Sequence, residues 1–132
     1  MRKARRPNVL VVTWDTTRAD RLGPYGRKNA GTPTLDRLAK RGVVFEECRA
    51  AAPITMPSHS TLFTGLYPPR HGVRDNGIFK LPDSVTTLAE HLGQAGYGTG
   101  AAIGSFVLSR QFGIAQGFEH FDDRIASEHL DH

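Results

Sequence analysis

The sequence of 132 residues has one cysteine, Cys48, and therefore cannot form an internal disulfide. It also lacks any apolar run close to the roughly 20 residues of a membrane-spanning helix, which excludes such a span within this stretch. The apolar segment that follows the basic N-terminus, residues 9–12, is shorter than the roughly 7 residues of a signal-peptide core. Since a lone cysteine also agrees with a reducing compartment, we expect a cytoplasmic location.

Outside its first six residues the sequence has no net charge. Four of its 17 basic residues, Arg2, Lys3, Arg5 and Arg6, precede residue 7, which leaves 13 against 13 acidic residues in the rest. The formal charge of +4 thus belongs to a short arm. Because such an arm is more often a solvated terminus than a DNA-reading element, we predict no nucleic-acid partner. We divide the chain into a basic arm, residues 1–6, and a folded segment, residues 7–132.

The pattern of apolar residues predicts alternating strands and helices. Residues 8–14 form a near-continuous apolar and β-branched run, typical of a strand buried on both faces of a parallel sheet. A helix is expected between Thr32, its N-cap, and Gly42, and a second strand starts at residues 43–45.

The second half of the chain continues this alternation. A helix is predicted at residues 55–65, with Pro57 in its first turn and Gly65 as its C-cap. After a loop at residues 66–82, Ser84 caps a third helix that ends at Gly96, and residues 97–106 contain a further strand. This order predicts an α/β fold with a mostly parallel sheet flanked by helices.

Two places in this fold could carry chemistry. Asp15 closes the first strand, and the carboxyl ends of parallel strands are where ligands and metals bind, so Asp15 with Thr16 is a candidate site for a hard metal; the alternative is an Asp that caps the next turn. Thr55 and Ser58 lie at the start of a helix, where free N–H groups and the helix dipole favour a phosphate or sulfate ester. The alternative there is a plain Thr or Ser cap.

Several segments together resemble the N-terminal part of a sulfatase in the alkaline phosphatase superfamily. They are PNVLVV at residues 7–12, Asp15, TMPSH at 55–59, LFTG at 62–65, YPPRHG at 67–72, SVTTLAEHL at 84–92 and AGYGT at 95–99. The family signature has Cys or Ser, any residue, Pro, Ser and Arg, followed by Leu-Thr-Gly. The resemblance implies an alkaline-phosphatase-like α/β fold that is incomplete in this chain, with the remaining metal ligands expected beyond residue 132.

The chain departs from the family pattern at the position of the nucleophile. Thr55 stands where the family oxidises Cys or Ser to formylglycine, so no formylglycine is expected, and Thr55 would act as an alkoxide. His59 replaces the motif arginine and would hydrogen-bond the ester or carry a proton; the alternative is an exposed histidine of the first turn. We expect Cys48 to be a buried small hydrophobe. The lysine and histidine that sulfatases commonly have downstream are missing from residues 103–108.

One further residue carries a predicted substrate contact. Asn76 resembles a substrate-contacting asparagine of the phosphonate monoester hydrolase branch, although an asparagine before Gly77 is also typical of a type I′ turn. His71 is expected to shape the loop around it.

The resemblance predicts a metal-dependent hydrolase of sulfate or phosphate esters that uses a threonine nucleophile. The metal would be Ca²⁺ by resemblance, with Mn²⁺, Zn²⁺ or Mg²⁺ as alternatives, and the substrate a small-molecule ester. A phosphoryl-group transferase and a catalytically silent anion-binding module are the alternatives. Because sulfatases are several-fold longer than 132 residues, we expect an N-terminal fragment with little or no activity alone. The residues define neither the ester nor the oligomeric state.

Overall fold

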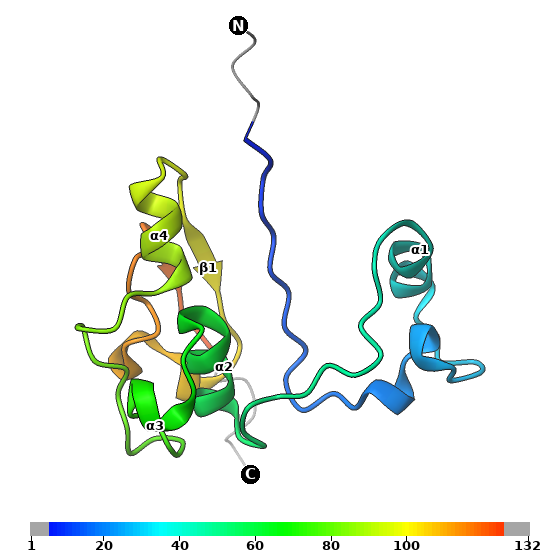
Figure 1. Cartoon of the computed structure of the whole chain (residues 1–132), viewed down its shortest axis with the longest axis horizontal. Coiled ribbons are helices and arrows are strands. Elements are labelled where there is room, and N and C mark those ends of the chain that lie inside the picture. The colour runs from blue at the N-terminus through cyan, green and yellow to red at the C-terminus, as the bar shows by residue number, and fades with distance from the viewer. Residues whose placement is uncertain (1–5, 126–132) are drawn as a thin grey trace, which may run out of the picture. The chain divides into compact units, whose positions relative to one another are not determined.

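The computed structural model describes residues 6–125, and the chain divides into two compact units, Met1–Cys48 and Arg49–His132 (Figure 1). Each unit has its own short elements. The first contains the 3-10 turns η1 (Ala19–Arg21) and η2 (Gly23–Tyr25) and the helix α1 (Pro33–Arg41). The second contains α2 (Thr55–Thr64), α3 (Pro68–His71), α4 (Leu88–Gln94), β1 (Gly100–Ala102), η3 (Phe106–Leu108), η4 (Arg110–Phe112) and β2 (His120–Asp122).

The first unit is organised by α1, which packs against η2. The predicted helix is confirmed: Pro33 opens it, and the Gly42 N–H closes it on the Leu38 carbonyl at 2.9 Å. Thr32 precedes the helix as predicted, but its side chain does not cap it. The Thr32 hydroxyl instead accepts from the Gly23 N–H at 3.0 Å, which ties η2 to the start of α1.

The strands predicted at residues 8–14 and from residue 43 are wrong. In the described part of the chain only β1 and β2 form strands, and residues 7–14 run as an extended trace without an arrow (Figure 1). Leu10 and Val43 are 86% and 78% exposed. The apolar pattern identifies a segment suited to a buried strand, but a strand exists only where a neighbour supplies its backbone hydrogen bonds, and no described strand does so here.

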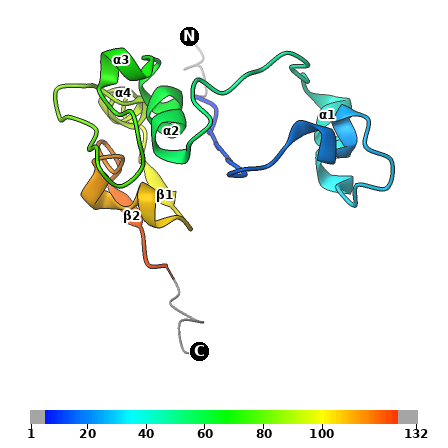
Figure 2. The ribbon, with the colours of Figure 1, turned by 90° about the horizontal axis from the view of Figure 1, so that it is seen from below.

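The second unit holds the hydrophobic core, between α2 and the segments that follow it. Its fully or nearly buried members are Met56, Val73, Leu81, Leu108, Phe112 and Ile114. Phe63 of α2 contacts Phe118 edge to face at 6.2 Å between ring centroids, a favoured aromatic geometry. This packing anchors α2 to the chain that leads into β2. Figure 2 shows the helices of this unit on one side of the β1–β2 pair.

A parallel pair of strands confirms the predicted sheet type. Gly100 pairs with His120 and Ala102 with Asp122, so the strand predicted within residues 97–106 is three residues long. Arg110 lies on the connection between the strands and donates to the Phe121 carbonyl at 2.7 Å and to the Asp123 carboxylate at 2.9 Å. The guanidinium thereby ties the crossover to the end of β2.

The helix predicted to start at Ser84 starts at Leu88 instead. Thr87 caps it through a reciprocal capping box: the Thr87 hydroxyl accepts from the Glu90 N–H at 3.2 Å, and the Glu90 carboxylate accepts from the Thr87 N–H at 2.7 Å. Residues before Thr87 form a turn, in which the Val85 N–H donates to the Pro82 carbonyl. Across residues 6–125, no helix has the length and apolarity needed to cross a bilayer.

Candidate functional site

The candidate site lies at the start of α2, a helix that begins at Thr55 as predicted. Ile54 takes the N-cap position with extended backbone and no polar side chain, and Thr55 is the first helical residue and half-buried. Gly65 ends the helix at φ +69°, a left-handed conformation that glycine adopts without strain. Thr55 and Ser58, both half-buried, therefore lie in the first turn of the helix.

The backbone of this turn has fewer available donors than predicted. The Met56 N–H donates to Oδ1 of Asn76 at 2.8 Å, and Pro57 has no N–H. The Ser58 N–H already makes the first turn's bond to the Ile54 carbonyl at 3.2 Å. The expectation of several free N–H groups is therefore wrong for these positions, and the hydroxyls of Thr55 and Ser58 become the groups that could meet an ester.

His59 is buried, with 8% of its surface exposed, so the alternative of an exposed histidine is wrong. Its Nδ1 lies 2.8 Å from the Thr55 carbonyl oxygen. Because a carbonyl can only accept, Nδ1 carries the hydrogen, and a neutral ring has its lone pair at Nε2. His59, one helical turn after Thr55, thus contacts the Thr55 carbonyl through Nδ1 and has a second ring nitrogen, Nε2, that can accept a hydrogen bond.

Asn76 does not form the type I′ turn considered above. Such a turn needs a positive φ at both central residues, and among the described non-glycine residues only Thr16 and Asn29 have one. Asn76 is half-buried, its own N–H donates to the Asp75 carboxylate at 2.8 Å, and its side chain caps α2 through Met56. The predicted substrate contact of Asn76 stays a prediction.

His71 lies in α3, within the residues 66–82 for which the sequence predicts a loop. The side chain is fully buried; Nδ1 accepts from the Val73 N–H at 3.1 Å, and Nε2 lies 3.1 Å from the Thr61 hydroxyl. Since Nδ1 accepts, a neutral ring donates from Nε2 to Thr61. Burial lowers the pKa of His71 below its ordinary value, so the neutral form is favoured. The ring thereby joins α3 to α2.

Asp15 and Thr16 belong to the first unit, where they form a turn after the extended segment. Thr16 has φ +56°, a left-handed conformation that a β-branched residue rarely adopts. The Thr17 hydroxyl donates to the Asp15 carbonyl at 3.4 Å. Thr55 belongs to the second unit. A metal site shared by Asp15 and Thr55 therefore stays a prediction.

The donor chemistry of these residues fits a hard divalent cation. Carboxylate and hydroxyl oxygens are the ligands that Ca²⁺, Mg²⁺ and Mn²⁺ prefer. Within residues 6–125, no three or more His, Cys, Asp or Glu side chains gather into a group that could hold a metal. Asp15, Thr16 and Thr55 would therefore supply only part of a coordination sphere.

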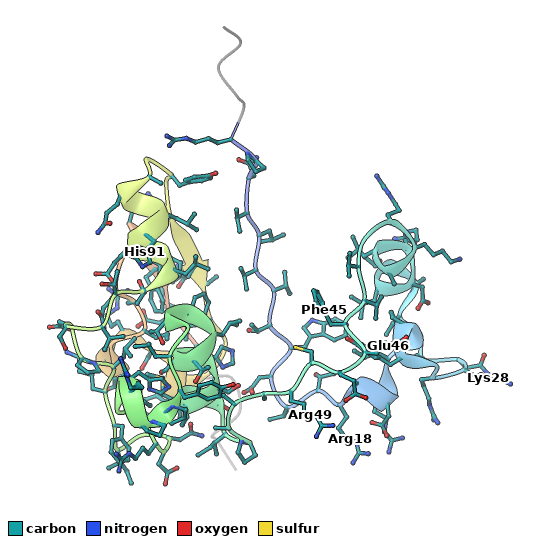
Figure 3. The ribbon with its side chains drawn as sticks, viewed as in Figure 1. Arg18, Lys28, Phe45, Glu46, Arg49 and His91 are labelled. Carbon is teal, nitrogen blue, oxygen red and sulfur yellow. The ribbon has the colours of Figure 1, made fainter. Side chains whose placement is uncertain are left out.

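Cys48 is exposed, which corrects the expectation that it is a buried hydrophobe. The physical reason is that residues 43–50 form no strand, so no layer of the fold covers them. Figure 3 shows the neighbouring side chains of Phe45 and Glu46, of which Phe45 is 69% exposed. Cys48 also lies outside α2, which begins at Thr55.

Comparison with known proteins gives a consistent result. The model of the Sulfatase family matches residues 7–131. The chain is 40% identical over 126 residues to steryl-sulfatase of Mus musculus, covering 88% of this chain and 20% of that protein. It is 30% identical to Delta 4,5-hexuronate-2-O-sulfatase of Bacteroides thetaiotaomicron, covering 87% and 24%. A solved structure of a 2-O GAG sulfatase superposes with a TM-score of 0.66 at 29% identity, over 77% of this chain and 22% of that one. The chain thus spans about a fifth of the length of these relatives.

Proposed function

The chain belongs to the sulfatase family and contains part of its alkaline-phosphatase-like α/β fold, and from this we propose that it supplies the nucleophile of a metal-dependent hydrolase of sulfate or phosphate esters. Thr55 is the proposed nucleophile. The observation that carries the proposal is the position of Thr55 as the first residue of a ten-residue helix, with its carbonyl held by His59. The positive end of the helix dipole favours the anionic group that Thr55 would attack.

In the proposed reaction, the Thr55 hydroxyl oxygen forms a bond to the phosphorus or sulfur of the ester while the bond to the alcohol oxygen breaks in line. The hydroxyl proton passes to a base, for which Nε2 of His59 is the candidate, and the departing alkoxide takes a proton from water. Water then cleaves the covalent threonyl ester and regenerates the hydroxyl. Ser58 and Asn76 are the proposed contacts to the ester oxygens.

A divalent cation, when bound, would lower the pKa of the hydroxyl and neutralise charge on the ester. Asp15, Thr16 and Thr55 are the residues of this chain that would hold it. Ca²⁺ is proposed first, by family resemblance. Addition of a chelator should abolish turnover, and the cation that restores it identifies the metal.

The threonine favours phosphoryl over sulfuryl chemistry. Threonine cannot become formylglycine by oxidation of Cys or Ser, and the segment 103–108 supplies no lysine or histidine to a sulfate. The names of the relatives favour sulfate esters. A covalent threonyl ester could also pass its group to an alcohol, so product analysis with an added acceptor separates transfer from hydrolysis.

Kinetics of the full-length protein with 4-nitrophenyl phosphate and 4-nitrophenyl sulfate test the nucleophile. Thr55→Ala should lower kcat by several powers of ten, as removal of a catalytic hydroxyl does, and Thr55→Ser should retain turnover. The same change at exposed Thr86, Thr86→Ala, is the matched control and should leave kcat unchanged. Undiminished hydrolysis by Thr55→Ala would overturn the assignment.

A further inference from the structure

The chain between residues 71 and 76 is attached to α2 at both of its ends. At one end, the buried His71 ring lies 3.1 Å from the Thr61 hydroxyl, near the C-terminal half of α2. At the other, the Asn76 side chain accepts from the Met56 N–H at 2.8 Å, in the first turn. Val73, between them, is fully buried in the core. These contacts hold the Asn76 side chain at the start of α2.

The bond from Asn76 acts on the peptide group that follows Thr55. The Thr55 carbonyl and the Met56 N–H belong to one planar unit, because the peptide bond between them is rigid. His59 Nδ1 lies 2.8 Å from the carbonyl oxygen, and Asn76 Oδ1 lies 2.8 Å from the nitrogen. Both polar atoms of this unit are therefore held, which limits rotation about the backbone bonds on either side, including ψ of Thr55.

The local sequence cannot supply this cap. Ile54 occupies the N-cap position, where Ser, Thr, Asp or Asn would normally accept from an N–H of the first turn. Asn76 replaces that missing cap from 20 residues away in the chain. Its identity as the acceptor is fixed by chemistry, because only Oδ1, and not the amide nitrogen, can accept from a backbone N–H.

We propose that Asn76 is a positioning residue that fixes the orientation of Thr55 by capping α2 through the Met56 N–H. This inference rests on the proposed role of Thr55 as nucleophile. It is distinct from the proposed contact between Asn76 and the ester, since the cap uses the amide oxygen and an ester contact would use the amide N–H groups. A substitution that keeps an acceptor oxygen but removes the amide N–H groups, such as Asn76→Asp, therefore separates the two roles.

Hydrogen exchange at the Met56 amide in the full-length protein tests the cap. Asn76→Ala removes the acceptor and should accelerate exchange at Met56 about fivefold, the equilibrium equivalent of a typical lost cap. Asn76→Asp keeps an acceptor oxygen and should retain the protection. Thr87→Ala removes the cap of α4 and is the matched control, expected to leave Met56 exchange unchanged.

Exchange at Met56 that is unaltered by Asn76→Ala, lost in Asn76→Asp, or accelerated as much by Thr87→Ala would overturn the proposal. The kinetic readout is independent: Asn76→Ala should lower kcat about tenfold or more, and Asn76→Asp should recover kcat while raising KM, because its charge repels the anionic ester. An Asp variant with kcat as low as Ala would contradict positioning. A wild-type protein that hydrolyses neither ester would refute the proposed function, while exchange at Met56 would still decide the cap.

Discussion

Replacing His71 by phenylalanine should destabilise the second unit strongly, because a fully buried ring with two hydrogen bonds becomes purely apolar. The buried Val73 N–H would lose its acceptor, which costs about 1–3 kcal/mol for an unsatisfied group. The Thr61 hydroxyl is half-buried and can turn to water, so its loss adds about 0.5–1.5 kcal/mol. Together these give a decrease of about 1.5–4.5 kcal/mol in the free energy of unfolding.

Protonation of His71 should also make the stability of the second unit depend on pH. Burial lowers the pKa of His71 in the folded state below its ordinary value of about 6.5, so the unfolded state binds more protons between the two values. Stability should therefore be constant above about pH 7 and fall as the pH drops through about 6.5, by at most about 1.4 kcal/mol per pH unit. The carboxylates with lowered pKa, Asp20, Asp122 and Asp123, lose their contribution only below about pH 4, in a separate window.

Urea unfolding between pH 5 and 7.5 measures both effects. His71→Phe should lower the midpoint at pH 7.5 and remove the part of the pH dependence that His71 causes. His91→Phe places the same substitution on the exposed side of α4 and serves as the control, expected to change stability by less than about 0.5 kcal/mol (Figure 3). A His71→Phe variant as stable as wild type, or with the full wild-type pH dependence, would refute the reasoning.

Four other substitutions test the packing, the caps and one glycine conformation by the same urea assay. Met56→Ala should cost about 2–5 kcal/mol because the side chain is fully buried in the core; a loss below about 1 kcal/mol would contradict that burial. Thr87→Ala should lower the free energy of unfolding by about 1–2 kcal/mol, because Thr87 caps α4, and Ser84→Ala should lower it by less than about 0.5 kcal/mol. A larger loss for Ser84→Ala than for Thr87→Ala would contradict the cap seen in the structure and favour Ser84. Gly113→Ala should cost more than about 1 kcal/mol, since φ is +82° and a Cβ there would collide with the Leu81 carbonyl; a neutral effect would exclude this conformation.

Local signals predicted the helices of this chain well where proline and glycine define their ends. Pro33 and Gly42 delimit α1, and Gly65 ends α2, as expected from the sequence. The true cap of α4 also has a local signal in the sequence. Thr87 has Glu90 three residues later, the pattern of a capping box, whereas Ser84 has no acidic residue at that spacing.

Features that depend on distant partners could not be predicted. Residues 8–14 have the composition of a buried strand, but composition cannot provide the neighbour that makes a strand. The short helix α3 begins with two prolines, which resemble a loop although proline is favoured in the first turn of a helix. The cap of α2 by Asn76 joins positions 20 residues apart, and no local sequence pattern predicts it.

Mass spectrometry of the covalent intermediate tests the nucleophile most directly. The full-length protein, incubated with 4-nitrophenyl phosphate or 4-nitrophenyl sulfate and quenched in acid, should carry a phosphoryl or sulfuryl group that peptide fragmentation locates on Thr55. Thr55→Ala should carry none, and Thr55→Ser should carry it on the serine. A wild-type protein that hydrolyses the ester without modification of Thr55, or with the group on another residue, would contradict the account.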